Sequence, residues 1–163
     1  MIHIRLAVPE DFDQICALFN ESHALHHQAL PHFFQDSTYI VYEKNIFDAA
    51  FAQKSEVIFI AEEGEKLLGA VHAEIHESKN PAHQGAKVLT KRKFGFVHTL
   101  VVAAASREHG IGKELLMKVE DWFKERGIDE IEIEAWSFNE RAENFYKKAG
   151  YEPLNLRLYK KLS

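Results

Sequence analysis

The spacing of apolar residues divides the chain into segments of strand type and helix type. Alternating positions or short continuous apolar runs predict strands over residues 2–7, 56–62, 67–76, 94–102 and 128–136. Apolar residues three and four positions apart predict helices over residues 10–30, 39–53, 111–126 and 140–149. The alternating end of the chain, residues 151–162, is expected to add one or two closing strands.

This order of elements predicts one α/β domain over residues 1–163. The elements run β-α-α-β-β-β-α-β-α-β, and the turn at residues 63–66 makes the second and third strands a hairpin. We expect a central, mostly antiparallel mixed sheet with helices on both faces. A dinucleotide-binding doubly wound fold is excluded, because the glycine-bearing turn follows a central antiparallel meander instead of the first strand.

The most informative stretch is the turn Arg107-Glu108-His109-Gly110-Ile111-Gly112. It follows one predicted strand and opens the helix predicted from residue 111. The first N–H groups of a helix have no backbone acceptor and lie at the positive end of the helix dipole. Glycine lets an anionic group approach the backbone, and Arg107 adds a positive charge at the mouth. The turn is therefore predicted to hold a phosphate group.

Two motifs resemble those of the GNAT superfamily of N-acetyltransferases. The first, Arg107-x-x-Gly110-x-Gly112, is similar to the coenzyme A-binding motif Gln/Arg-x-x-Gly-x-Gly/Ala of that family. The second spans residues 139–151 and begins Asn-Glu-Arg-Ala. Both occur in the family's order and separation, so the resemblance covers residues 94–151. Three alanines at 103–105 replace the more usual polar, proline-containing turn but leave the phosphate loop in place.

The resemblance implies a binding site for acetyl-CoA as co-substrate. Backbone N–H groups of the loop would hold its pyrophosphate, and the end of the preceding strand would pair with the pantetheine arm. An N–H near Leu100 would polarise the thioester carbonyl. Asn139 would contact the pantetheine or shape its groove, and the hydroxyl of Tyr146 would protonate the leaving thiolate. The cofactor-binding residues implied in this way are Leu100, Val101, Val102, Arg107, Glu108, His109, Gly110, Ile111, Gly112, Lys113, Asn139 and Tyr146.

Acetyl transfer to an amine also needs a proton acceptor, because an alkyl amine with a pKa of about 10.4 is mostly charged near neutral pH. His98 is the first candidate, since it lies on the strand expected to line the cleft and a histidine pKa of about 6.5 suits the task. Glu74, which shares a strand face with His72 and His76, and Glu134 are competing candidates. Each could instead be an ordinary polar residue of the sheet.

A histidine-rich segment, residues 23–34, has two interpretations. His23 and His27 are four residues apart and could share a metal ion. No cysteine or HExxH pattern accompanies them, so we predict that no metal is bound. With Phe33 and Phe34, the segment is expected to form one lip of the acceptor pocket or a plain helix surface.

Composition and charge limit the function, the cellular setting and the reaction route that the chain can have. A net charge of −5 argues against a general nucleic-acid binder and suits a cationic acceptor. No apolar run approaches the roughly 20 residues of a membrane span, the start of the chain does not resemble a signal peptide, and the lone Cys16 favours a cytoplasmic setting. Because Cys16 falls on a stripe predicted to be buried, we expect direct attack in a ternary complex instead of acetyl-enzyme chemistry.

The sequence therefore favours an acetyl-CoA-dependent N-acetyltransferase that acts on a primary amine, with a small cationic amine as the preferred acceptor. A protein N-terminus or lysine is the alternative acceptor. A non-catalytic acyl-CoA-binding sensor of the same fold, and a phosphate- or nucleotide-binding module of another class, are the other two hypotheses. The resemblance also allows a homodimer formed through sheet edges or the C-terminal strands.

Overall fold

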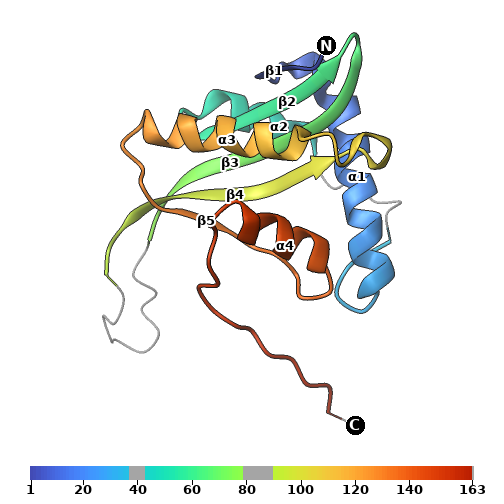
Figure 1. The fold of residues 1–163 in the computed structure, drawn as a ribbon, viewed down its shortest axis with the longest axis vertical. Helices are drawn as coiled ribbons and strands as arrows, with labels where there is room; N and C mark the ends of the chain where they lie inside the picture. Colours follow the sequence, from blue (N-terminus) through green and yellow to red (C-terminus); the bar gives the residue numbers. More distant parts are fainter. Residues whose placement is uncertain (37–42, 79–89, 163) are drawn as a thin grey trace.

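A five-stranded sheet lies between two layers of helices in the computed structural model, which describes residues 1–36, 43–78 and 90–162 (Figure 1). The strands are β1 His3–Leu6, β2 Glu56–Glu63, β3 Lys66–Glu77, β4 Lys93–Val102 and β5 Ile131–Ile133. The helices are α1 Phe12–Ala29, α2 Lys44–Ala52, α3 Ile111–Lys124 and α4 Glu140–Lys148, with short 3-10 turns η1 Pro9–Asp11 and η2 Ala104–Ser106. None of the helices described is long and apolar enough to cross a bilayer.

The sheet confirms the predicted mixed, mostly antiparallel topology. Its order is β1-β2-β3-β4-β5, and every neighbouring pair is antiparallel except the parallel pair β4 and β5. The β2–β3 connection is the expected tight hairpin, in which Gly64 takes a left-handed φ of 63°. The sheet therefore has two edges, β1 and β5.

Each face of the sheet carries its own hydrophobic core. On one face, α3 packs Leu115, Val119 and Phe123 into a core that also contains Val57 and Phe59 of β2 and Leu68, Val71 and Ala73 of β3. On the other face, α1 and α2 pack against Ile58 and Ile60 and their neighbours. The prediction of helices on both faces is thus confirmed, and the alternation along each strand is what supplies two apolar surfaces.

A buried ion pair ties the first strand to the first helix. The guanidinium of Arg5 donates to both carboxylate oxygens of Asp11 at 2.7 and 2.9 Å, and to Glu62 on β2 at 2.8 Å. Asp11 is only 5% exposed, and its carboxylate also accepts from the backbone of Val8. The hydrogen bond from Arg5 holds the pKa of the Asp11 carboxyl below its usual range despite burial. This pair fixes where α1 leaves the sheet.

Two predicted elements differ from the observed ones. The closing strands expected at residues 151–162 are wrong: this stretch contains no helix or strand and runs away from α4 as an extended segment (Figure 1). The strand predicted at 128–136 is shorter, because only Ile131–Ile133 pairs with β4. A strand-like pattern forms a strand only where a neighbouring strand accepts its hydrogen bonds. The helix predicted at 39–53 is seen from Lys44, and residues 39–42 lie outside the described residues.

Candidate active site

The two parallel strands of the sheet separate after only three residue pairs. Their pairing begins at Gly95–Ile131 and ends at Val97–Ile133, whereas β4 continues for five more residues to Val102. Along that stretch β4 is paired with β3 on its other side. The edge of β4 that faces away from β3 is therefore available to an extended ligand, as the resemblance implied for Leu100, Val101 and Val102.

A β-bulge lies at the point of separation. His72 on β3 pairs with Thr99 and Ala73 pairs with Val97, so His98 is an extra residue on β4. The bulge explains why Val97 and Leu100, three positions apart, both pack against the α3 core. His98, one residue after Val97, lies on the opposite face of the sheet, the side covered by α1 and α2.

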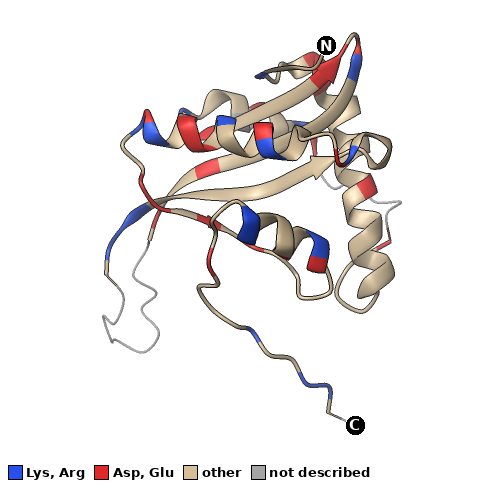
Figure 2. Cartoon of the chain, viewed as in Figure 1, with Lys and Arg blue, Asp and Glu red and all other residues tan. Residues whose placement is uncertain are grey.

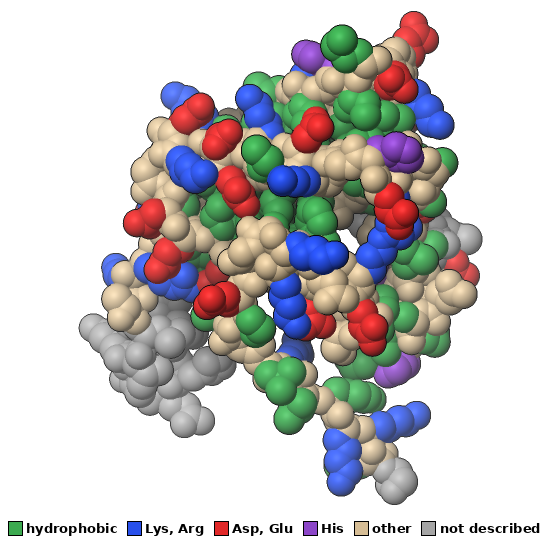
Figure 3. Space-filling model, in the orientation of Figure 1, with side chains coloured by type: hydrophobic (Ala, Val, Ile, Leu, Met, Phe, Trp, Pro, Cys, Tyr) green, Lys and Arg blue, Asp and Glu red, His purple; other side chains and the backbone are tan. Residues whose placement is uncertain are grey.

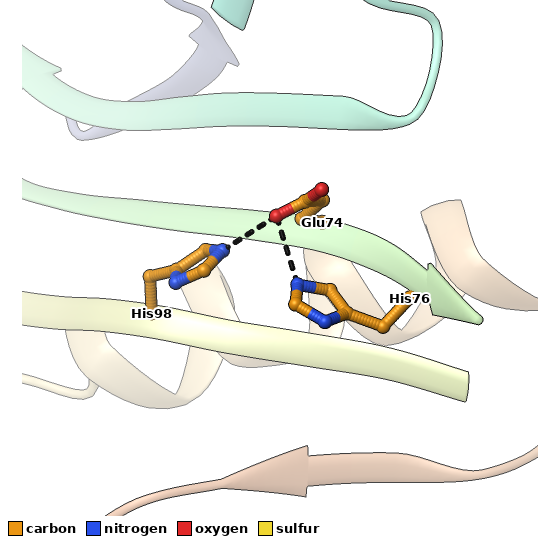
Figure 4. A group of neighbouring side chains, drawn as sticks. All are labelled: Glu74, His76 and His98. Carbon is orange, nitrogen blue, oxygen red and sulfur yellow. Dashed lines mark hydrogen bonds and ion pairs between the residues drawn. The ribbon is translucent and has the colours of Figure 1, made fainter. Parts of the chain in front are cut away.

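His98 belongs to a cluster that also contains Glu74 and His76 (Figure 4). One carboxylate oxygen of Glu74 accepts from Nε2 of His98 at 3.0 Å and from Nε2 of His76 at 2.8 Å. Burial alone would raise the pKa of the Glu74 carboxyl, but the hydrogen bonds from His98 and His76 outweigh it and lower that pKa. The structure therefore joins two of the three predicted bases, with Glu74 as a charged carboxylate that orients an imidazole.

A second histidine–carboxylate pair lies directly beside this cluster. The ring of His72 stacks on that of His98 with centroids 4.8 Å apart, and its Nε2 lies 3.1 Å from Glu56 on β2. His72 is 7% exposed. Burial and the nearby charge of His98 lower the pKa of His72, although the Glu56 carboxylate opposes that shift. Sequence reasoning missed Glu56, because its partner is 16 residues away and no local pattern marks the contact.

Glu134, the third predicted base, is not on β2, β3 or β4, the strands that carry these two pairs. It follows the end of β5 and is exposed. Groups such as Glu74, His76 and His98 could also coordinate a transition metal ion, since their ligand atoms all lie within 4.8 Å of one another. The hydrogen bonds among them already satisfy these atoms without an ion, and the absence of a metal stays a prediction.

The glycine-bearing turn has the geometry of an anion cradle. Gly110 is the N-cap of α3 with a left-handed φ of 82°, and Glu108 also has a positive φ of 71°. The first helical hydrogen bond runs from the N–H of Glu114 to the carbonyl of Gly110 at 3.1 Å. The N–H groups of Ile111, Gly112 and Lys113 therefore precede the first intrahelical donor, which leaves them oriented for a ligand.

Arg107 serves the loop in a different way from the one expected. Its Nε donates to the carbonyl of Val102 at 2.9 Å, and its guanidinium pairs with Glu21 of α1 at 2.9 Å. The same oxygen of Glu21 accepts from the backbone of Ala104 at 2.9 Å. The expected positive charge at the mouth is thus already neutralised, and the Arg107 side chain fixes the turn to α1. His109 closes the turn locally, with its Nδ1 2.7 Å from the Arg107 carbonyl.

The second motif builds α4, which lies beside the turn (Figure 1). Asn139 is the N-cap of the helix, and its side-chain oxygen accepts from the N–H of Ala142 at 3.1 Å. This confirms the helix start predicted at residue 140. Phe145 packs close to Gly112, where an added Cβ would lie 3.6 Å from its ring. Burial raises the pKa of the neighbouring Tyr146 phenol to about 12, so it keeps its proton at neutral pH.

The histidine-rich segment forms a lip between α1 and the loop that follows β5. His23 and His27 each bond a backbone carbonyl at 2.8 Å, of Gln35 and Phe34 respectively, which folds the segment back along α1. Phe34 then packs against Trp136, with ring centroids 4.8 Å apart. These contacts build the aromatic lip, and the absence of a metal ion at His23 and His27 stays a prediction.

Comparison with known proteins gives a consistent result. A model of the acetyltransferase (GNAT) family matches residues 14–151. N-alpha-acetyltransferase 30 of Schizosaccharomyces pombe is 28% identical over 110 residues, which are 68% of this chain and 67% of that protein. A mutant of the BH1408 protein from Bacillus halodurans has a similar structure, with a TM-score of 0.89 and 21% identity over 99% of both chains. An aminoglycoside acetyltransferase from an uncultured soil metagenomic sample gives a TM-score of 0.71 and 17% identity, covering 99% of this chain and 97% of that one.

The buried histidine gives a test of the site's electrostatics. We expect the imidazole of His72 to titrate below the ordinary histidine pKa of about 6.5. The unfolded chain then binds more protons than the folded one, so the free energy of unfolding should fall as the pH drops below that value. NMR titration of the imidazole shifts, and denaturant unfolding at several pH values, measure both. His72→Gln should flatten this part of the profile, whereas the matched change at an exposed histidine, His3→Gln, should not. An unchanged profile in His72→Gln would contradict the assignment.

Proposed function

The chain belongs to the GNAT acetyltransferase family, and on that premise we propose that it moves the acetyl group of acetyl-CoA to a primary amine. One observation carries this proposal. β4 separates from β5, and the free edge of β4 runs from the histidine–glutamate cluster to the glycine-capped start of α3. A donor phosphate site and a proton acceptor thus lie at the two ends of one free strand edge. A cytoplasmic setting, where acetyl-CoA is available, is part of the proposal.

For the donor, we propose that the backbone from Arg107 to Lys113 holds the pyrophosphate of acetyl-CoA. The N–H groups of the first turn of α3 supply donors, and the helix dipole favours the negative charge. The pantetheine arm would lie along the free edge of β4, paired like a further strand. The N–H of Leu100 would then polarise the thioester carbonyl. Asn139, as the N-cap of α4, shapes the other wall of the groove.

For the acceptor, we propose that His98 is the general base and Glu74 its positioning partner. When Nε2–H of His98 donates to the carboxylate of Glu74, the lone pair on Nδ1 is free to take a proton. Removing that proton converts an ammonium into a neutral amine, whose nitrogen can attack the acetyl carbon. The carboxylate then stabilises the imidazolium that forms. Glu134 is retained as a binding group for a cationic acceptor.

For the leaving group, we propose Tyr146. Attack of the amine forms the new C–N bond and leaves one surplus proton on nitrogen, which passes to water. Collapse of the tetrahedral intermediate then breaks the C–S bond and releases a thiolate. A phenol that stays protonated at neutral pH can donate a hydrogen bond to the developing thiolate and finally its proton. Its ring is held by Phe145 and Tyr151, with centroids 5.2 and 5.9 Å away.

We propose direct transfer in a ternary complex. A covalent route would need a thiolate, and burial together with the nearby Asp13 carboxylate raises the pKa of Cys16. Cys16 is half-buried on α1, not fully buried as the helical stripe predicted. A thiol in that state is a poor nucleophile.

The acceptor we favour is a small cationic amine. The carboxylates of Glu56 and Glu74 lie beside the stacked rings of His72 and His98, and the aromatic lip offers ring faces to a cation. The aminoglycoside acetyltransferase with the same fold acts on acceptors of that type. A protein N-terminus is the second candidate, because the Schizosaccharomyces pombe relative is an N-alpha-acetyltransferase.

The first test separates a transferase from a binding sensor. Acetyl-CoA should raise the melting temperature of the protein, since it binds the folded state only, whereas ATP and NAD should not. Free thiol should then accumulate from acetyl-CoA only when an amine is added, and a panel of polyamines, aminoglycosides and peptide N-termini would rank the acceptors. Stabilisation by acetyl-CoA without thiol release from any amine would favour the sensor.

The second test addresses the base. His98→Gln should lower kcat by roughly a hundredfold or more, because the amine must then lose its proton to water. The matched control is His76→Gln, which removes the other imidazole on the Glu74 carboxylate. An equal loss in both variants would indicate a structural cluster instead of a base.

The third test addresses the acid. Tyr146→Phe removes one hydroxyl, so kcat should fall by roughly a hundredfold while the KM for acetyl-CoA changes little. The loss should shrink with a thioester whose thiolate is a better leaving group. Tyr151→Phe is the matched control, since that hydroxyl contacts Glu120 at 3.3 Å on α3. A Tyr146→Phe enzyme with full turnover would refute the role.

A further inference from the structure

The cluster of Glu74, His76 and His98 (Figure 4) contains one residue that the proposed reaction does not use. His98 acts there as the base and Glu74 as its positioning partner, whereas the imidazole of His76 has no part in acetyl transfer. Its Nε2 nevertheless lies 2.8 Å from the same carboxylate oxygen of Glu74 that His98 contacts at 3.0 Å. A base needs only one carboxylate to orient it, so the position of His76 calls for a separate explanation.

The sheet brings the three side chains together on one of its faces. Glu74 and His76 are two positions apart on β3, so they share a face of that strand. His98, at the bulge in β4, lies across from them, with its ring centroid 5.7 Å from that of His76. One nitrogen of each imidazole and one carboxylate oxygen therefore all lie within 4.8 Å of one another. The described part of the chain contains no other such group, and the histidines on the face seen in Figure 3 lie apart from one another.

Two imidazole nitrogens and one carboxylate oxygen are ligand atoms that suit zinc. A zinc ion binds such atoms at about 2.0–2.2 Å in a tetrahedral arrangement, which places neighbouring ligand atoms about 3.4 Å apart. The distances from the Glu74 oxygen to the two nitrogens, 3.0 and 2.8 Å, are slightly shorter, so small movements of the side chains would admit the ion. The three side chains are 28% to 37% exposed, which lets an ion enter from solvent and leaves water as the fourth ligand.

The charges along the two strands also favour a cation at the cluster. No Lys or Arg occurs in β3 after Lys66 or in β4 after Lys93, as the colouring of these strands shows (Figure 2). The charges that act on the Glu74 carboxylate are those of His76 and His98. Both imidazoles must be neutral to bind a metal. A zinc ion would therefore meet a negative carboxylate without competition from a lysine or arginine on these stretches.

We propose that Glu74, His76 and His98 bind a zinc ion that enters from solution and inhibits the enzyme reversibly. The ion is not a resident cofactor, so the prediction that the reaction uses no metal is unchanged. The inhibition rests on the proposed function of His98 as the base. When Nε2 of the neutral ring binds zinc, the ring carries its proton on Nδ1. That nitrogen then has no lone pair for the acceptor ammonium, and the charge of the ion repels the ammonium as well.

Isothermal titration calorimetry of Zn²⁺ into the chelator-treated full chain tests the site without acetyl-CoA or an acceptor. One ion should bind per chain. His76→Gln should raise the Kd by roughly a hundredfold or more, because it removes a direct ligand and even outer-shell changes at metal sites cost about ten- to a hundredfold. Glu77→Gln, which removes an acid from the other face of β3, should leave the Kd unchanged. A wild type that binds no zinc would overturn the proposal, as would zinc binding that His76→Gln leaves intact.

Inhibition is measured separately, with acetyl-CoA and the best acceptor amine. The acetylated amine is quantified directly by mass spectrometry, because the released thiol would itself bind zinc. Free Zn²⁺ at about ten times its Kd should lower the wild-type rate roughly tenfold, and excess chelator should restore it. His76→Gln should keep the metal-free rate and resist the same zinc concentration.

The two measurements separate this inference from the proposed function. Zinc that fills the wild-type site and leaves the rate unchanged would overturn the inhibitory role. A chain that acetylates no amine would instead contradict the proposed function, and calorimetry would still decide the zinc site.

Discussion

The site depends on one constraint in the sheet: β4 and β5 pair for three residues and then separate. A sheet strand with only one neighbour has unsatisfied N–H and C=O groups along its free edge, and those groups must find a partner. Here the free edge starts at a β-bulge and ends at the turn that opens α3. Helix α4 cannot close the gap by backbone pairing, although its Phe145 lies close to Gly112 at the start of α3. An extended ligand bound at this place, as we propose, would therefore complete the sheet.

The bulge and the cluster behind it belong to the same arrangement. His98 follows Val97 and so faces away from α3, where its ring meets Glu74 on the neighbouring strand, and the bulge beside it returns Leu100 to the α3 face. A carboxylate that accepts from two imidazoles holds its negative charge between them, which keeps Glu74 ionised. The adjacent His72 is held in its neutral form instead, because burial lowers the pKa of its imidazole. A neutral His72 ring stacked on His98 avoids placing two positive charges side by side.

Local features were predictable from the sequence, and features that join distant segments were not. The turn at Gly110 could be predicted because a helix start and a left-handed residue leave local marks. The sheet with an apolar core on each face was also predictable, because side chains along a strand point alternately to its two faces. The role of Arg107 was not predictable, since its partner Glu21 is 86 residues away. The prediction of closing strands was wrong for a related reason. Residues 151–162 have a strand pattern, but the pattern does not reveal whether a neighbouring strand is there to pair with them.

The bulge at His98 also sets how this enzyme can change over evolutionary time. A substitution at that position would alter one side chain and leave the sheet as it is. A deletion of the extra residue would restore regular pairing and place Val97 and Leu100 two positions apart, so both would still face the α3 core. The sheet would survive, and the imidazole that meets Glu74 would be lost. The bulge is therefore a place where relatives can gain or lose one residue without repacking either face of the sheet.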